Sequence, residues 1–213
     1  MSKRRYRQYC SLARALDLVG ERWTLLIIRE LLSGPRRYQE LLDNLPGIGT
    51  NLLATRLREL GGAGIVQKVI LWAPRIHAYK LTEMGKGLEP AVVELARWGV
   101  TVLGDPHADD HWSAQWNPLA LAARFQADKA AGIDATYEYD VGGHVFHARI
   151  RDQSIETQLG STLSPDVRLV TDEETFLDLA TQSLSVEQAA DSGKLRMEGA
   201  PEAIRSSLEI FAA

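Results

Sequence analysis

The sequence predicts two domains, a mainly helical N-terminal half and an α+β C-terminal half. Apolar residues recur at helical spacing through most of residues 11–103, whereas a strict period of two begins at Ala135. The charge also changes sign, because residues 1–104 carry 16 Lys/Arg against 9 Asp/Glu and residues 105–213 carry 8 against 19. Between the halves, GDPHADDHW at 104–112 has the Gly, Pro and acidic residues typical of a linker.

The composition argues against a membrane-spanning protein and against a secreted one. The 213 residues lack an apolar run of the roughly 20 residues that a membrane span needs. The basic N-terminus has no signal-like apolar stretch, and the single cysteine cannot form an internal disulfide, so we expect a cytoplasmic protein. The predicted boundaries are residues 1–104 for the first domain, 105–114 for the linker and 115–213 for the second domain.

Three helices are predicted before residue 46. Ser11 is expected to cap the first, with its apolar stripe facing inward at Leu12, Ala15, Leu16 and Val19. RWTLLIIRELL, from Arg22, is apolar on nearly all sides and predicts a buried central helix. RRYQELLDNL predicts a short third helix that Pro46-Gly47 ends.

A fourth helix, also short, follows a tight turn after the third helix, and the two together form a helix-turn-helix pattern. Thr50 is expected to cap it, Leu53, Leu57 and Leu60 share its inner stripe, and Gly61-Gly62 ends it. IVQKVILWAP and AYKLT then predict a β-hairpin, which in this position is the wing of a winged helix. A last helix is expected at about 83–103.

This half resembles the HxlR-type winged-helix transcription regulators from about Cys10 to Trp98. The matching motifs are RWTLLIIRELL, GPRRYQEL, PGI, RLREL and the LT-x-x-G after the wing. The chain departs from the pattern in having Ser11 where Pro is usual and a double Gly at 61–62. The resemblance implies a homodimer, held by its N-terminal and last helices, whose recognition helices enter successive major grooves of a double-stranded DNA operator.

The candidate DNA-binding residues lie on the helix-turn-helix and the wing. Basic side chains there can neutralise phosphates, whereas side chains near the start of the second helix can reach base edges. Each arginine also has a structural alternative: Arg56, for example, could pair with Glu59 or Glu30. The candidates are Arg36, Arg37, Tyr38, Thr50, Asn51, Thr55, Arg56, Arg58, Arg75 and His77.

Cys10 has two interpretations. A cysteine near a helix start is usually a small buried core residue, which is the interpretation we favour. In some relatives a cysteine at this place senses oxidants or electrophiles. The helix N-terminus and the nearby arginines would favour the thiolate that such chemistry needs: Arg4, Arg5, Arg7 and Arg14.

The C-terminal half predicts helices packed on one face of a sheet. After an amphipathic helix in NPLALAARFQADKA, ATYEYDV and HVFHARIR flank a two-residue Gly142-Gly143 turn. That turn pairs Val141 with His144, Tyr139 with Phe146, Tyr137 with Ala148 and Ala135 with Ile150, and so puts the apolar residues on one face and polar residues such as Glu138 on the wet one. His144 and His147 then point to opposite faces and cannot hold one metal together.

The remaining elements follow in the order strand, strand, helix, helix, strand, helix. SIETQL, VRLVT and KLRMEG predict the strands. Thr171-x-x-Glu174 and Ser185-x-x-Gln188 predict capping boxes for two helices, and Pro201 opens the last.

This half resembles the sterol-carrier-protein-like domain over about residues 115–211. The matching segments are ATYEYDVGGHVFHARIRDQSIE, PDVRLVTDEETFLDLATQSLSVEQAADSGKLRMEGAPEA and the closing helix, with A-x-x-SGKLRMEG as the most diagnostic. The resemblance implies an apolar cavity that binds a small hydrophobic ligand, whereas the pattern alone predicts only core. The residues concerned are Tyr137, Tyr139, Phe146, Ile150, Leu169, Phe176, Leu179, Leu208 and Phe211.

Together these features predict a homodimeric DNA-binding regulator whose C-terminal domain senses a ligand. The alternative is a ligand-binding or interaction module with a winged helix that no longer reads DNA. An enzyme is not expected, because no phosphate loop or nucleophile elbow is found, and neither a cofactor nor a metal is predicted. His107, Asp109, Asp110 and His111 are metal-ligand types, but their loop predicts a solvated linker.

Overall fold

The computed structural model describes residues 5–72, 75–104, 107, 110–181 and 183–211. Of the residues discussed above, Arg4 and Asp109 lie outside this part. The chain divides into two compact units, residues 1–95 and 96–213, which are described separately. The proposed linker at 105–114 and the boundaries on either side of it stay predictions.

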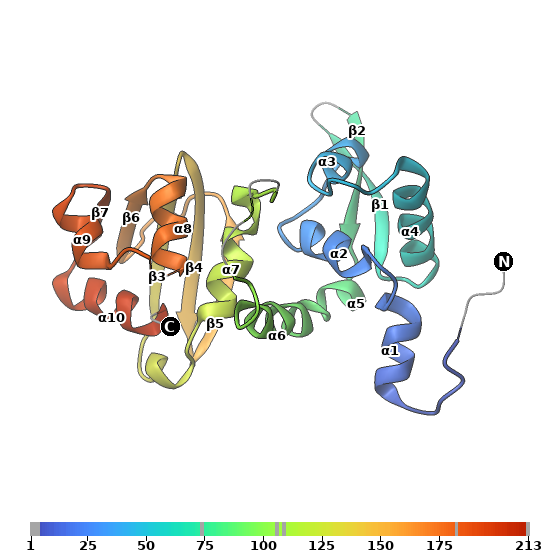
Figure 1. Ribbon diagram of the computed structural model, residues 1–213, viewed down its shortest axis with the longest axis horizontal. Coiled ribbons are helices and arrows are strands. Elements are labelled where there is room, and N and C mark those ends of the chain that lie inside the picture. The colour runs from blue at the N-terminus through green and yellow to red at the C-terminus, as the bar shows by residue number, and fades with distance from the viewer. Residues whose placement is uncertain (1–4, 73–74, 105–106, 108–109, 182, 212–213) are drawn as a thin grey trace. The chain divides into compact units, whose positions relative to one another are not determined.

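The first unit has the predicted order of helices followed by a hairpin (Figure 1). Its elements are α1 (Ser11–Val19), α2 (Thr24–Leu32), α3 (Tyr38–Asp43), α4 (Thr50–Gly62), β1 (Val66–Trp72), β2 (Arg75–Leu81), α5 (Glu83–Lys86) and the first part of α6 (Glu89–Val100). The strands are antiparallel, with Val66 opposite Leu81 and Trp72 opposite Arg75. The winged helix-turn-helix architecture is therefore confirmed.

A compact apolar core holds α2, α3 and α4 together. The side chains of Ile27, Ile28, Leu41, Leu53 and Leu60 are almost completely buried. The predicted inner stripe of α4 is confirmed, since its third leucine, Leu57, is also buried. One connection was not predicted: the backbone of Arg36 exchanges two hydrogen bonds with Tyr79 and so ties the segment before α3 to the wing.

Of the apolar stripe predicted to face inward on α1, only Val19 is buried, so the expectation is wrong for Leu12, Ala15 and Leu16. Leu12 is 65% exposed and Leu16 is 38% exposed, whereas Ala13 and Val19 are buried. Helical spacing shows that residues share a face, but it does not show what that face contacts. The N-cap position belongs to Cys10, one residue before Ser11.

Two other helix limits also differ from expectation. Gly49 rather than Thr50 is the N-cap of α4. The single helix expected at 83–103 is divided into α5 and α6, because Gly87 ends α5 after one turn. The Thr82 hydroxyl caps this turn by accepting a hydrogen bond from the amide of Gly85 at 3.1 Å.

The second unit is a sheet of five strands with helices packed on it, as predicted (Figure 1). After the end of α6 come η1 (Ala114–Trp116), α7 (Asn117–Arg124), η2 (Asp128–Ala130), β3 (Ala135–Val141), β4 (His144–Arg151), β5 (Ser154–Leu159), β6 (Val167–Thr171), α8 (Glu173–Thr181), α9 (Val186–Asp191), β7 (Leu195–Gly199) and α10 (Pro201–Phe211). The strand order is β5-β4-β3-β6-β7, and β3 runs parallel to β6.

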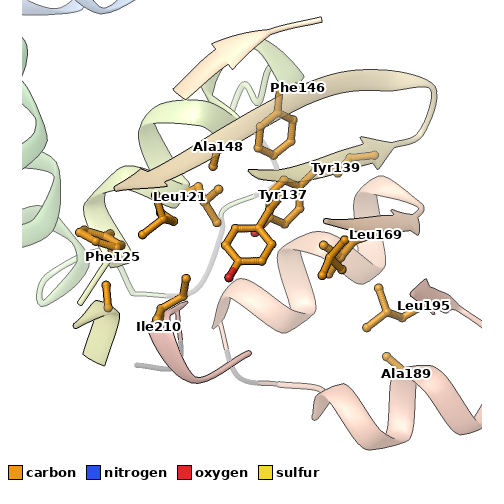
Figure 2. Close-up of a cluster of buried hydrophobic side chains, with 14 residues drawn as sticks. Leu121, Phe125, Tyr137, Tyr139, Phe146, Ala148, Leu169, Ala189, Leu195 and Ile210 are labelled. Carbon is orange, nitrogen blue, oxygen red and sulfur yellow. The ribbon is translucent and has the colours of Figure 1, made fainter. Parts of the chain in front are cut away.

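The predicted register of the β3–β4 hairpin is confirmed at all four pairs, from Val141 opposite His144 to Ala135 opposite Ile150. The rings of Tyr139 and Phe146 therefore stack, with centroids 4.9 Å apart. Figure 2 shows this apolar sheet face, which α7, α9 and α10 cover with Leu121, Ala189 and Ile210.

Two details of this unit differ from the sequence-based expectation. Thr171 ends β6, and its neighbour Asp172 caps α8 by accepting hydrogen bonds from the amide and hydroxyl of Thr175, both at 2.8 Å. The face expected to be wet contains Glu138, which is only 5% exposed and forms an ion pair with Arg168 at 3.3 Å. The capping box from Ser185 to Gln188 is confirmed.

Candidate functional site

The outer face of α4 carries a polar surface opposite its buried leucines. Asn51 and Arg58 are exposed on this face, and Thr55 beside them is half-buried. Because Leu53, Leu57 and Leu60 anchor the inner side, these three outer side chains are held on a fixed helix. The outer face of α4, defined by Asn51, Thr55 and Arg58, can therefore offer an amide, a hydroxyl and a guanidinium to a partner.

Arg56 lies on the flank of α4 and is engaged within the unit. Its guanidinium forms ion pairs with Glu59 at 2.7 Å and with Glu21 at 2.9 Å. Only 14% of its side chain is exposed. Of the two structural partners expected, Glu59 is found; Glu30 instead pairs with Arg29.

The start of α3 is organised by backbone and side-chain contacts. The Tyr38 hydroxyl donates a 2.6 Å hydrogen bond to the carbonyl oxygen of Thr50 and joins the beginnings of α3 and α4. Arg37 is half-exposed and pairs with Glu40 at 2.8 Å. The Nε and Nη2 atoms of Arg36 are buried, and neither has a hydrogen-bond partner among the described residues.

The wing contributes further basic groups. Arg75 and His77 are exposed on β2, at the end of the hairpin next to residues 73–74. A hollow of about 530 Å³ between α4 and β1 is lined by Arg58 and by Lys68, whose ammonium lies 5.6 Å from the Tyr79 ring centroid. Lys68 is not among the predicted site residues, although its exposed strand position beside a basic helix could have suggested it.

Cys10 is exposed, so the expected burial of this residue in the core of its own unit is not found. Its two neighbours in the sequence, Tyr9 and Ser11, are exposed as well.

A cavity of about 470 Å³ lies in the second unit between the sheet and the helices that cover it. Five of the nine predicted ligand residues line this C-terminal cavity: Tyr139, Leu169, Leu179, Leu208 and Phe211. The other four do not belong to the lining described. Of these, Tyr137, Phe146 and Ile150 are buried in the core, and Phe176 packs against it.

Two tyrosines of β3 illustrate the difference between lining and core. Burial raises the pKa of both phenols, and that of Tyr139 strongly, so both stay protonated at neutral pH. Tyr139 lines the C-terminal cavity, whereas the Tyr137 hydroxyl is buried without a hydrogen-bond partner among the described residues. Figure 2 shows the two rings next to each other on the strand.

The C-terminal turn of α7 borders the same cavity. Leu121 and Arg124 line it, and burial lowers the pKa of the Arg124 guanidinium. From α6, Arg97 donates hydrogen bonds to the carbonyl oxygens of Ala123 at 3.0 Å and of Phe125 at 3.4 Å. Arg124 is not among the predicted ligand residues, and its only signal in the sequence is a charged residue in an otherwise mainly apolar helix.

Two kinds of site are not found in the described part of the chain. No group of three or more His, Cys, Asp or Glu side chains is arranged to hold a metal ion there. None of its helices combines the length and hydropathy needed to cross a membrane.

The buried helices, the hairpin and the free outer face of α4 define the first unit as a winged helix-turn-helix domain. The HxlR-like helix-turn-helix family model matches residues 18–106, and the SCP-2 sterol transfer family model matches residues 119–207. The chain belongs to the HxlR-like family, and its C-terminal half is an SCP-2-like domain.

Relatives of the first half carry names of the same kind. An uncharacterized HTH-type transcriptional regulator of Mycobacterium tuberculosis is 47% identical over 97 residues, which are 45% of this chain and 61% of the relative. The HTH-type transcriptional regulator YodB of Bacillus subtilis is 38% identical over 39% of this chain and 76% of its own. The solved reduced form of YodB is 33% identical, with a TM-score of 0.40 over 47% of this chain and 100% of that one.

Proposed function

We propose that the protein is a cytoplasmic, homodimeric transcription regulator that binds double-stranded DNA through α4. The observation that carries this proposal is the outer face of α4, whose three polar side chains are exposed or half-buried on a helix fixed by three buried leucines. A helix presented in this way can enter a major groove, where the amide of Asn51 reads a base edge and the guanidinium of Arg58 binds a phosphate. Names of the relatives support the same class of function.

Basic groups around this face are proposed to bind the DNA backbone. Arg37 is exposed at the N-cap of α3, and Lys68, Arg75 and His77 are exposed on the wing. Such contacts release counterions and give affinity without sequence information. Arg56 is not among them in our proposal, since its guanidinium is shared by two glutamates.

The C-terminal cavity is proposed to bind a small ligand with an apolar part. Its volume of about 470 Å³ falls within the range of about 300–1,000 Å³ typical of small-molecule sites. A ligand can regulate DNA binding only if it binds the DNA-competent and the incompetent states with different affinity. We infer that the dimer contacts involve α1 and α6, because both expose large apolar side chains.

The test is titration of the full chain against DNA from its own promoter region at several salt concentrations. A regulator should lose affinity steeply with salt and prefer one site over unrelated DNA by about 10³-fold or more. Asn51→Ala should reduce that preference. If binding is weak and equal on all DNA while an apolar compound still binds the cavity, the alternative holds, and the protein is a ligand-binding module with a non-reading winged helix.

A further inference from the structure

The α4–β1 hollow is the space of about 530 Å³ in the first unit that Arg58 and Lys68 border. It lies beside α4 between Ala54 and Gly61, where this helix runs next to β1 (Figure 1). Its described lining contains two cations, the amide of Gln67 and no carboxylate. Its volume falls within the range of about 300–1,000 Å³ typical of small-molecule sites, so it has room for a molecule rather than a single ion.

The two cations of the hollow differ from other cations of the same unit. Arg37 and Arg56 each form an ion pair with a glutamate, whereas the described part of the chain shows no ion pair of Arg58 or Lys68. The Lys68 ammonium instead lies 5.6 Å from the centroid of the Tyr79 ring, a distance at which the ring face attracts a cation. Because both positive charges border one space, an anion placed there is attracted by both.

Gly61 leaves the hollow open on the side of α4. A Cβ at this position would have the carbonyl oxygen of Val66 as its nearest neighbour, at 3.8 Å, which is an ordinary contact. Gly62 is the next residue and the last of α4, does not belong to the lining described, and would have no atom within 4 Å of an added Cβ. Both positions can therefore accept a side chain, but only the first borders the hollow.

The hollow also offers apolar surface. Ala54 and the ring of Tyr79 are half-buried on its wall, beside the buried side chains of Leu57 and Val66. A ligand that uses the whole lining therefore has a strongly anionic group and a flat apolar body.

We propose that the α4–β1 hollow is a second effector site, which takes a small phosphate monoester. Its phosphate binds Arg58 and Lys68, and its apolar body packs on Ala54 and Tyr79. A phosphate monoester matches two cations because it carries a charge of about −1.5 to −2 at pH 7. The inference rests on the DNA-binding function proposed above: Arg58 and Lys68 are also the proposed phosphate contacts of DNA, so the two ligands exclude each other.

Titration calorimetry of the full chain in a phosphate-free buffer at about 0.1 M ionic strength tests the site. 1-Naphthyl phosphate should bind about tenfold or more tightly than naphthalene-1-methanol and than inorganic phosphate, because it alone uses both parts of the lining. Lys68→Gln should remove most of its advantage over the alcohol. Gly61→Glu should do the same by adding a carboxylate beside the phosphate. Gly62→Glu adds the same charge outside the lining and should change the affinity by less than about threefold.

Competition separates a free phosphate monoester from the phosphates of DNA. At an ionic strength held constant with chloride, 1-naphthyl phosphate should lower the affinity of the unsubstituted protein for DNA. It should lower that of Gly61→Glu much less. If Lys68→Gln weakens DNA binding but none of the three probes binds the unsubstituted protein, the hollow serves DNA alone and the effector site is overturned.

Other outcomes also decide the matter. Equal affinity of Gly61→Glu and the unsubstituted protein for 1-naphthyl phosphate, or no preference for this probe over the alcohol, overturns the effector site. Loss of the probe in Leu179→Trp, which is designed to fill the C-terminal cavity, overturns it as well, because the probe then binds there. Binding of the probe as expected, without preference for any DNA site, overturns the proposed function and leaves the anion site in place.

Discussion

Arg56 and Arg58 lie two positions apart on α4, yet their surroundings give them different roles. Arg56 is held between Glu21 and Glu59 and is nearly buried, whereas Arg58 is exposed beside the hollow that Lys68 also lines. Both belong to the candidate DNA-binding residues of the sequence. Their helical positions alone could not separate them, because the carboxylate of Glu21 comes from a distant part of the chain.

Arg58→Ala is expected to weaken binding to all DNA sequences to a similar extent. If Arg58 neutralises one phosphate, the slope of log affinity against log salt concentration should fall by about 1. Fluorescence anisotropy at four salt concentrations measures this slope, with Arg205→Ala on α10 as the matched control. An unchanged slope would remove Arg58 from the phosphate contacts.

Arg56→Ala is expected to act on stability instead. Loss of two charge-assisted hydrogen bonds at a side chain that is 14% exposed should lower the free energy of unfolding by about 1–2 kcal/mol. Arg58→Ala should change it by less than about 0.5 kcal/mol. Urea unfolding followed by circular dichroism tests the difference. Were Arg56→Ala to reduce the salt slope without loss of stability, Arg56 would be a DNA contact after all.

At the scale of elements, local sequence rules predict pairs of neighbours better than they predict boundaries. The β3–β4 register follows from a two-residue turn and one apolar face, and all four expected pairs are present. The parallel pairing of β3 with β6 depends on a long connection, so alternation within either strand could not reveal it. The cap of α8 lies one residue later than the sequence pattern predicts, because both Thr171 and Asp172 are suitable cap types.

Asp172→Ala is expected to destabilise α8 by about 1 kcal/mol at neutral pH through loss of the cap. Hydrogen bonds from the amide of Thr175 and then from its hydroxyl hold the pKa of Asp172 below its usual value. The contribution is therefore complete above the unfolded pKa of about 3.9 and is lost as the pH falls through the lower folded value.

Urea unfolding of the two proteins at pH 7, 5 and 3 measures this contribution as a difference in stability. The difference should be constant between pH 7 and 5 and smaller at pH 3. A difference that grows on acidification would contradict the assigned cap.

For the molecule as a whole, packing within a single chain does not account for the large apolar side chains on the surface. Leu95 is 51% exposed and Trp98, three residues later on α6, is 66% exposed. The sequence predicted the amphipathic face of this helix, but the folded chain buries only Val92 of α6. Contiguous exposed apolar residues of this size are typical of interfaces.

Trp98→Glu is expected to convert the proposed homodimer into monomers, because a buried unpaired carboxylate is costly in an apolar interface. Sedimentation velocity at micromolar concentration measures the change, and binding to a two-half-site operator should weaken with it. Leu163→Glu is the matched control, since Leu163 is 102% exposed in the second unit. A protein that is already monomeric before substitution would contradict the proposed assembly.

The contacts of Arg97 limit where recombination can exchange the C-terminal domain of such a chain. Arg97 lies within residues 18–106 that match the HxlR-like model, yet it belongs to the second compact unit, where its guanidinium binds carbonyl oxygens of Ala123 and Phe125. A recombination event at residues 104–112 would separate the arginine from these acceptors. We therefore expect exchange of the C-terminal domain to require either a change at Arg97 or the transfer of α6 as well, so that the natural unit of exchange is larger than the sterol-carrier-like domain itself.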